Sequence, residues 1–246
     1  MTLQGKRVLI TGGGTGVGAD MARSFAEAGA EVVVTGRREA HLTELARANP
    51  NIRAVVADVT QEQSVREMFE AAGPCDIVIA NAGAADSGLL ARTTLDQWNA
   101  MIAVNLTGVF LTLREGLRQM PGWGRLISVA STAGLRGFAY AAPYAAAKHG
   151  VVGLTRSLAL EVARRPITVN AICPGYLDTE MTDRSIANIV AKTGKSTEDA
   201  RAVLTATNPQ DRLIRPDEVT ATALWLCGPG ADSVNGQAIA LSGGEI

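Results

Sequence analysis

Short apolar segments alternate along this chain with longer segments in which apolar residues recur every three or four positions. The short segments are rich in Val and Ile and are almost continuously apolar, which is typical of parallel strands covered on both faces. We expect strands at residues 7–11, 31–35, 53–57, 76–80, 125–129, 168–172 and 237–241. The longer segments predict helices at residues 17–28, 39–48, 61–71, 94–118, 143–163 and 216–227.

This alternation predicts β-α-β units and therefore an α/β fold. We expect a doubly wound parallel sheet of about seven strands with helices on both faces. The length of 246 residues suits one domain, and residues 1–246 contain no internal repeat or linker composition. The whole chain is therefore expected to be a single domain.

One long segment, residues 176–215, breaks the alternation because it is more polar and contains no strand pattern. Long connections in compact domains are often lids or binding loops. The segment leaves the expected carboxyl edge of the sheet, so we interpret it as containing a substrate lid. The alternative is one or two surface helices that have only a packing role.

Composition and charge argue against several classes of function. The formal net charge is −1 and no block of like charges occurs, so we expect neither a nucleic-acid partner nor a membrane. We find no signal-peptide core and no apolar run long enough to span a bilayer. The cysteines Cys75, Cys173 and Cys227 lack disulfide or metal-ligand spacing, and His41 and His149 are far apart. We therefore expect no metal site and a reducing, cytoplasmic location.

A glycine-rich turn joins the first predicted strand to the first predicted helix, in the sequence Thr11-Gly-Gly-Gly-Thr-Gly-Val-Gly18. Glycine permits a tight turn and lets the backbone approach a pyrophosphate, while the N-terminus of the following helix offers free N–H groups and a positive dipole end. A plain turn between strand and helix is the alternative. The strand–glycine–helix context is the one that dinucleotide binding requires, so we expect a dinucleotide here.

The end of the second predicted strand indicates which dinucleotide binds. An acidic residue there would bind the ribose hydroxyls of NAD, whereas this chain has Gly36 followed by Arg37 and Arg38. Gly36 leaves space, and a guanidinium is well suited to a 2′-phosphate, so NADP(H) is favoured and NAD(H) is the alternative. At least one of the two arginines could instead simply begin the next helix on the surface.

Tyr144 and Lys148 lie four positions apart in a predicted helix, which places both side chains on one face, one turn apart. Two cations are available to lower the phenol pKa from about 10, the Lys148 ammonium and an oxidised nicotinamide. Each close cation lowers it by as much as about three units, and burial opposes part of this shift. We expect the pKa of Tyr144 to lie in the neutral to mildly alkaline range, which suits proton exchange with an alcohol or a ketone. The alternative is a packed tyrosine beside a solvated lysine; Ser131 and the dinucleotide turn argue against it.

Further motifs follow in order along the chain. They are Asp58-Val59, Asn81-Ala82-Gly83, Asn105, Ser131 thirteen residues before Tyr144, and Pro174-Gly175 followed by Leu177 and Thr179. Together with the glycine-rich turn and the Tyr-x-x-x-Lys pair, they make the chain resemble the short-chain dehydrogenase/reductase family over essentially its whole length.

The resemblance implies a Rossmann-type fold and a set of site residues. It implies the catalytic residues Asn105, Ser131, Tyr144 and Lys148. It implies cofactor contacts at Gly12, Thr15, Gly16, Val17, Gly18, Arg37, Arg38, Asp58, Val59, Asn81, Ala82, Gly83, Tyr144, Lys148, Pro174, Gly175, Leu177 and Thr179. In this family the tyrosine exchanges the proton, the serine holds the substrate oxygen, the lysine also holds the nicotinamide ribose, and the asparagine keeps a water-linked proton path.

Two positions depart from the family pattern. Ala80 stands where the family commonly has asparagine, which is a mild change. Thr15 stands where many NADP-using members have a basic residue. The prediction of NADP(H) therefore depends on Arg37 and Arg38.

The expected activity is interconversion of a ketone and a secondary alcohol, and the resemblance favours a 3-oxoacyl-thioester reductase. Arg184, Lys192 and Lys195 could meet a phosphorylated carrier, although a solvated face explains them equally well. The alternatives are a dehydrogenase of a small, cyclic or aromatic secondary alcohol and a non-catalytic dinucleotide-sensing module. The latter would be expected to lose Tyr144 or Lys148. The resemblance also implies a homo-oligomer, a tetramer or a dimer, that pairs the helices at 94–118 and 143–163.

Overall fold

The computed structural model describes residues 2–120 and 122–246, and in these residues seven strands form one parallel sheet. The strand order is β3-β2-β1-β4-β5-β6-β7, so the direction of winding reverses between β1 and β4. The strands are β1 (Arg7–Thr11), β2 (Glu31–Gly36), β3 (Ile52–Val56), β4 (Ile77–Ala80), β5 (Gly124–Val129), β6 (Ile167–Pro174) and β7 (Ala238–Leu241). This confirms the predicted doubly wound sheet.

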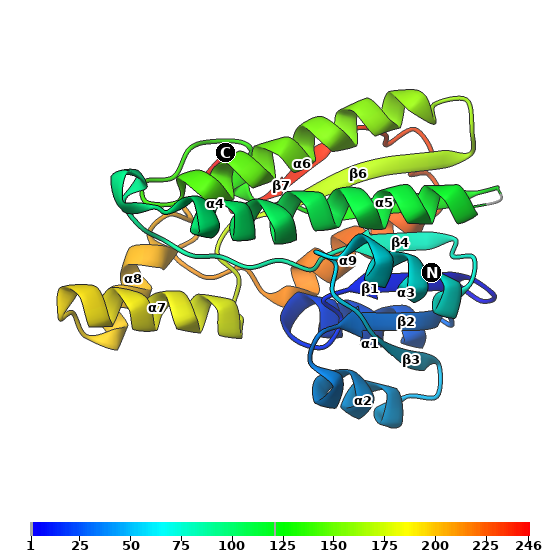
Figure 1. The fold of residues 1–246 in the computed structure, drawn as a ribbon, viewed down its shortest axis with the longest axis horizontal. Coiled ribbons are helices and arrows are strands. Elements are labelled where there is room, and N and C mark those ends of the chain that lie inside the picture. The colour runs from blue at the N-terminus through cyan, green and yellow to red at the C-terminus, as the bar shows by residue number, and fades with distance from the viewer. Residues whose placement is uncertain (1, 121) are drawn as a thin grey trace.

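Helices cover both faces of the sheet (Figure 1). On one face, apolar side chains of α3 (Glu62–Ala72), α5 (Gly108–Gln119) and α6 (Ala142–Glu161) form a core with the strands. On the other face, α1 (Gly16–Glu27), α2 (Glu39–Ala48) and α9 (Pro216–Cys227) form a second core. The continuous apolar character of β1, β4 and β5 follows from this arrangement, because each faces a core on both sides.

The predicted helix at 94–118 is interrupted in the structure. It consists of α4 (Leu95–Ile102), a π-helical turn at Ala103–Thr107 and then α5. The side-chain amide of Asn105 donates hydrogen bonds to the carbonyl oxygens of Met101, at 3.1 Å, and Ala84, at 2.9 Å. Single π-helical turns inside α-helices frequently mark functional sites, and this one contains a predicted catalytic residue.

The same stretch corrects one expectation from the sequence. By length and composition, the helical stretch Leu95–Gln119 is apolar enough to cross a membrane, because an 18-residue window within it has a mean hydropathy of 1.3. Half of that window is buried inside the fold, and the core helix of a globular domain passes the same test. The stretch is therefore weak evidence for a membrane span.

Residues 176–215 form two helices, α7 (Glu180–Thr193) and α8 (Thr197–Thr205), and Leu177 makes one isolated parallel bridge to Ile214. Gly194 ends α7 in the left-handed conformation at φ +71°, and the Ser196 hydroxyl accepts a hydrogen bond from the Asp199 N–H at the start of α8. Both helices extend beyond the sheet on one side of the molecule (Figure 1). A small cluster of their own, Ile186, Ala200 and Leu204, holds them together.

Candidate active site

The glycine-rich turn follows β1 at the carboxyl edge of the sheet, and two of its glycines are required by close backbone contacts. Gly12 has φ +65°, and a Cβ there would lie 2.8 Å from the Cα of Ala82. A Cβ on Gly18 would overlap the carbonyl oxygen of Gly12. The turn is therefore as tight as the sequence predicts, with its backbone facing the space beside β4.

The start of α1 offers a site for an anion. Thr15 precedes the helix, and among the described residues no side chain caps it and no acidic residue occupies its first turn. The N–H groups of the first turn are thus available, and the helix dipole favours negative charge there. These features fit the pyrophosphate of a dinucleotide. The side chain of Val17 is buried in the core, so this residue presents its backbone to the turn.

A network centred on Asn81 and Thr11 holds this turn against β4. The Asn81 amide donates hydrogen bonds to the carbonyl oxygens of Thr11, at 2.9 Å, and Gly12, at 3.2 Å. In return, the Thr11 hydroxyl accepts hydrogen bonds from the N–H groups of Asn81 and Ala82, both at 3.1 Å. The Asn-Ala-Gly motif thus fixes the path of the glycine-rich turn.

The two arginines after β2 face different partners. The Arg38 guanidinium donates a hydrogen bond to the Thr15 hydroxyl at 3.0 Å and lies 3.9 Å from a carboxylate oxygen of Glu180 on α7. Arg37 lies near Asp58. Burial raises the pKa of Asp58, but hydrogen bonds from Thr60 and the charge of Arg37 lower it by more, so the pKa lies below its ordinary value. A Cβ on Gly36 would meet nothing closer than 3.9 Å. The end of β2 therefore has open space at Gly36 and is followed by two cationic residues.

Asp58 and Val59 have separate roles in the fold. The Asp58 carboxylate accepts hydrogen bonds from the N–H of Thr60, at 2.9 Å, and from its hydroxyl, at 2.7 Å. Val59 is buried, and a Cβ on Gly108 at the start of α5 would lie 2.8 Å from its side chain. The side chain of Val59 thus packs in the core, and its backbone remains for contact with a ligand.

Lys148 and Asn105 converge beside Gly83. Lys148 is only 3% exposed, and its ammonium donates a hydrogen bond to the carbonyl oxygen of Val129 at 2.9 Å. A Cβ on Gly83 would lie 3.0 Å from the Asn105 side-chain oxygen and 3.8 Å from the Lys148 nitrogen. Asn105 is fully buried, and its side-chain oxygen accepts a hydrogen bond from the Ala84 N–H at 3.2 Å. Three of the predicted motifs therefore meet at one point.

Tyr144 lies one turn before Lys148 on α6, and the Lys148 nitrogen is 5.6 Å from the centre of its ring. Burial raises the pKa of Tyr144 to about 12, and a hydrogen bond with Ser131 only partly opposes this. Burial also lowers the pKa of Lys148 to about 8. With the protein's own groups alone, burial therefore raises the pKa of Tyr144 where we expected a lowered one. The part of the expectation that counts a nicotinamide cation stays a prediction.

Ser131 follows β5 in extended backbone conformation, with φ −177°. Its hydroxyl accepts a hydrogen bond from the N–H of Ala133 at 3.1 Å. This bond starts the short 3₁₀ turn Thr132–Gly134, which packs tightly against α6: a Cβ on Gly134 would lie 2.7 Å from the carbonyl oxygen of Lys148. The two catalytic segments are thereby held in register.

The segment after β6 returns to the glycine-rich turn. Pro174 ends β6, and the N–H of Gly175 donates a hydrogen bond to the carbonyl oxygen of Leu241 at 2.9 Å. A Cβ on Gly16 would lie 3.4 Å from the Thr179 methyl group, so Thr179 flanks the start of α1. Leu177 packs against the core on the α1 side. The structure thus brings both ends of the predicted cofactor site together.

Several features near this site have no counterpart in the sequence predictions. The Phe138 and Tyr176 rings meet edge to face, with centres 6.5 Å apart. Buried Cys173 lies close enough to Lys148 for that charge to lower its pKa slightly, although burial raises it to about 11. Glu245 in the C-terminal tail pairs with Arg136. The residues of these pairs are distant in sequence, so no local motif indicates that they are in contact.

Tyr140 lies in the loop that leads into α6, and its backbone is strained. It adopts φ +65°, a conformation that a residue with a bulky side chain rarely adopts, and its ring is 62% exposed. The carbonyl oxygen of Tyr140 accepts a hydrogen bond from the Gly88 N–H at 2.8 Å, which ties this loop to the one after β4. Strain of this kind clusters at functional sites.

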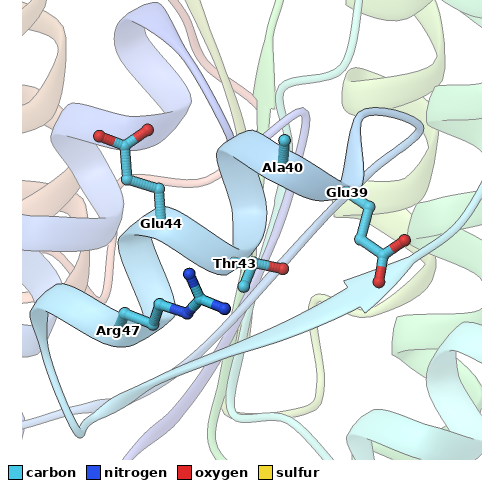
Figure 2. A pocket seen from close by; sticks show the side chains of 5 residues that line it. All are labelled: Glu39, Ala40, Thr43, Glu44 and Arg47. Atoms are coloured by element: carbon cyan, nitrogen blue, oxygen red, sulfur yellow. The ribbon is translucent and has the colours of Figure 1, made fainter.

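A separate surface hollow of about 450 Å³ lies along α2 (Figure 2). Its lining residues all belong to that one helix: Glu39, Ala40, Thr43, Glu44 and Arg47. It includes none of the residues that converge on Gly83. In the part of the chain that the structure describes, no group of three or more His, Cys, Asp or Glu residues is placed to hold a metal ion.

Known proteins resemble this chain over nearly its full length. It is 36% identical to the D-beta-hydroxybutyrate dehydrogenase of Cupriavidus necator, with 99% of each chain covered. It is 34% identical to the 3-oxoacyl-(acyl-carrier-protein) reductase of Vibrio harveyi, covering 99% of this chain and 98% of that one. A crystal structure of an actinorhodin polyketide ketoreductase variant with NADPH has a TM-score of 0.90 and 36% identity, covering 100% of this chain and 99% of that one.

The family profile described as short chain dehydrogenase matches residues 6–189. This stretch runs from β1 into α7 and includes the glycine-rich turn, the convergence at Gly83 and the Tyr144–Lys148 pair. The profile, the relatives and the parallel sheet agree with one another. The chain therefore belongs to the short-chain dehydrogenase/reductase family of oxidoreductases, which use a nicotinamide dinucleotide to interconvert ketones and secondary alcohols.

Proposed function

We propose that this protein is an NADP(H)-dependent reductase of a 3-oxoacyl thioester, with Tyr144 as its proton donor. The observation that carries the proposal is the convergence of Lys148, Asn105 and the Asn-Ala-Gly motif at Gly83, one helical turn from Tyr144. A non-catalytic dinucleotide sensor would need Lys148 only to hold the cofactor, and it would have no use for the Tyr144 hydroxyl one helical turn away.

The protein groups divide the work of proton transfer. The Tyr144 hydroxyl donates its proton to the carbonyl oxygen of the substrate as that oxygen gains electrons, and the Ser131 hydroxyl donates a hydrogen bond that fixes the same oxygen. The Lys148 ammonium stabilises the tyrosinate left behind. Asn105 holds the π-helical turn open beside Lys148, where a water-linked path returns the proton. When bound, a nicotinamide cofactor would supply the hydride for the carbonyl carbon.

The cofactor preference follows from charge at the end of β2. Arg37 and Arg38 follow Gly36, where a Cβ would meet nothing closer than 3.9 Å, and among residues 36–38 none is acidic. Guanidinium groups bind phosphate with paired hydrogen bonds, so they favour the 2′-phosphate of NADP(H). Gly12, Thr15, Gly16, Gly18 and the motifs at Asp58, Asn81 and Pro174 would hold the rest of the dinucleotide.

The substrate side is formed by α7 and α8, which we propose act as a lid over the site. The name of the Vibrio harveyi relative supports a 3-oxoacyl thioester as substrate. The pair of rings formed by Phe138 and Tyr176 supports a second candidate, a dehydrogenase of a cyclic or aromatic secondary alcohol. Both candidates use the same proton-transfer residues.

An absorbance assay decides between these functions. Purified protein is given NADPH or NADH with a panel of 3-oxoacyl thioesters, cyclic ketones and aryl ketones, and cofactor oxidation is followed. We expect turnover of thioesters with NADPH, and we expect Arg38→Ala to raise the KM for NADPH about tenfold while leaving that for NADH almost unchanged. A preference for NADH would contradict the assignment of Arg37 and Arg38. Absence of turnover with every carbonyl would contradict the enzymatic proposal.

We further propose a homotetramer in the cytoplasm, with a dimer as the alternative assembly. The helices that would pair, α4, α5 and α6, carry the exposed apolar residues Leu95, Phe110 and Leu160, which are 71%, 41% and 80% exposed. Large apolar side chains left in water on neighbouring helices are typical of an interface between subunits. Light scattering coupled to gel filtration measures the mass of the assembly, and a monomer at micromolar concentration would contradict this proposal.

A further inference from the structure

The C-terminal tail turns back toward the site after β7. Gly243 and Gly244 both adopt left-handed conformations, at φ +62° and +98°. A Cβ on Gly243 would overlap the side chain of Asn208, so the tail lies directly against the end of the lid segment. The turn directs the next residue, Glu245, inward.

The Glu245 carboxylate is buried beside the segment that follows β6. Its side chain is only 3% exposed, and one of its oxygens lies 3.4 Å from where a Cβ on Gly175 would be. The carboxylate pairs with the guanidinium of Arg136, which comes from the loop between β5 and α6. One contact therefore joins the tail, the Ser131–Tyr144 loop and the Pro174-Gly175 segment.

The contact continues through two aromatic rings into the lid. The Arg136 guanidinium lies 4.6 Å from the centre of the Phe138 ring. That ring meets Tyr176 edge to face, with an angle of 88° between the planes. Tyr176 in turn packs against the lid cluster that contains Ile186 and Leu204.

Burying a carboxylate is costly unless it is paired, and the Glu245 carboxylate is both buried and paired with Arg136. The burial of the Glu245 carboxylate is therefore explained by the groups that the carboxylate holds in place. The residues linked to it, Arg136, Phe138 and Tyr176, form a chain of contacts from the loop before α6 to the cluster between α7 and α8.

We propose that Glu245 is a positioning residue for the substrate side of the site. Its carboxylate holds Arg136, and through Arg136 it fixes the Phe138 and Tyr176 rings as a wall between Tyr144 and the lid. The inference rests on the proposed function, since a wall of this kind acts on the carbonyl substrate and leaves the dinucleotide untouched.

The electrostatics of Tyr176 agree with this geometry. Burial raises the pKa of Tyr176, the charge of Glu245 raises it further, and the charge of Arg136 lowers it. Tyr176 is also close enough to raise the pKa of Tyr144, although burial of Tyr144 is the larger cause. The tail carboxylate, the wall and the proton donor are thus within electrostatic reach of one another.

The kinetic test compares Glu245→Gln with the wild type under the NADPH assay. We expect the KM for the ketone to rise about fivefold or more, with kcat changed less than twofold and the Kd for NADPH unchanged. Glu31→Gln is the matched control, because Glu31 also pairs with an arginine, Arg7, at the opposite edge of the sheet. The variant that combines Arg136→Glu with Glu245→Arg restores the ion pair with reversed charges. Its KM for the ketone should therefore return close to the wild-type value.

A spectroscopic test reports on the wall independently of catalysis. The chain has three tyrosines, so in a variant with Tyr140→Phe and Tyr144→Phe the tyrosinate absorbance belongs to Tyr176. We expect addition of Glu245→Gln to lower the pKa of Tyr176, because it removes the negative charge that opposes ionisation.

The outcomes separate the two proposals. If the wild type reduces ketones and Glu245→Gln leaves both KM and the Tyr176 titration unchanged, the role of Glu245 is wrong while the proposed function stands. If no carbonyl is turned over, the proposed function is wrong. If Glu245→Gln then also leaves the pKa of Tyr176 unchanged, the proposed coupling of Glu245 to the wall is wrong as well. The inference would also be wrong if the reversed-charge variant unfolded at the wild-type temperature but kept the raised KM for the ketone.

Discussion

Different kinds of contact stabilise the glycine-rich turn, where we propose that a dinucleotide binds, and helices α7 and α8, the proposed lid. At the glycine-rich turn, backbone meets backbone: Gly12 lies against Ala82, and Asn81 donates hydrogen bonds into the turn. In the lid, a small cluster centred on Leu204 joins α7 and α8. Arg201 adds exposed ion pairs with Asp178, at 3.6 Å, and Asp183, at 3.5 Å. The first region is fixed by shape, whereas the second depends on a few side chains.

This difference predicts different mobility. Exposed ion pairs contribute about 0–1 kcal/mol each, and a cluster of three buried side chains adds only a small apolar area. Segments with few buried contacts open locally at a fraction of the global free energy of unfolding. We therefore expect the lid to open while the glycine-rich turn stays formed, so that the cofactor site is rigid and the substrate side adapts.

Replacing Tyr144 by Phe has the largest expected effect, because it removes the proposed proton donor. General acid–base catalysis contributes about 10²–10⁴-fold, so we expect kcat for ketone reduction to fall by that factor. The ring stays, so binding of NADPH, measured by its fluorescence, should be unchanged. Near wild-type turnover would contradict the role of Tyr144, and loss of NADPH binding would contradict the separation of the two regions.

Replacing Gly12 by Ala tests the rigid region alone. The left-handed backbone and the 2.8 Å approach to Ala82 leave no room for a methyl group, so the turn must shift. We expect the Kd for NADPH to rise more than about tenfold and the free energy of unfolding to fall by about 1–3 kcal/mol. Gly88→Ala is the control, since a Cβ there would meet nothing within 4 Å. Unchanged affinity for NADPH would show that the turn is not fixed by shape.

The same contrast explains how much could be predicted from the sequence. The strands, the glycine-rich turn and the Tyr144–Lys148 pair have short-range signatures, since apolar runs, glycines and a spacing of four residues each reflect local geometry. The pairing of Glu245 with Arg136 joins positions 109 apart in sequence, so no local pattern announces it. The local pattern also does not indicate the π-helical turn, in which the Asn105 amide donates a hydrogen bond to the carbonyl oxygen of Ala84, outside the helix.

The pKa of Tyr144 shows a further limit of sequence reasoning. A spacing of four residues correctly places Lys148 near the tyrosine, but the balance between charge and burial depends on the surrounding packing. Burial dominates for both groups in the structure. The sign of the shift at Tyr144 therefore required the three-dimensional arrangement.

The pH dependence of catalysis should report Lys148. Its pKa is lowered by burial to about 8, so its ammonium is present below that pH and is lost above it. Because the ammonium stabilises the tyrosinate, we expect kcat/KM for ketone reduction to be level below pH 8 and to fall by up to about tenfold per pH unit above it. In Lys148→Arg the guanidinium keeps its charge throughout this range. The kcat/KM of this variant, even if it is low, should therefore not decline above pH 8. A wild-type profile that stays level to pH 10 would contradict the titration of Lys148.

Replacing Leu204 by Ala tests the lid and has the smallest expected effect. Leu204 is 5% exposed and is one of three buried residues in the cluster between α7 and α8, so its truncation loosens the lid without entering either main core. We expect the KM for the ketone to rise about threefold and amide hydrogen exchange in α7 and α8 to accelerate, with the Kd for NADPH unchanged. Val203→Ala is the matched control, because Val203 is the neighbouring residue and is 46% exposed. If Leu204→Ala weakened NADPH binding as strongly as it weakened ketone binding, the lid and the glycine-rich turn would be one cooperative unit, and the division between a rigid cofactor site and an adaptable substrate side would be wrong.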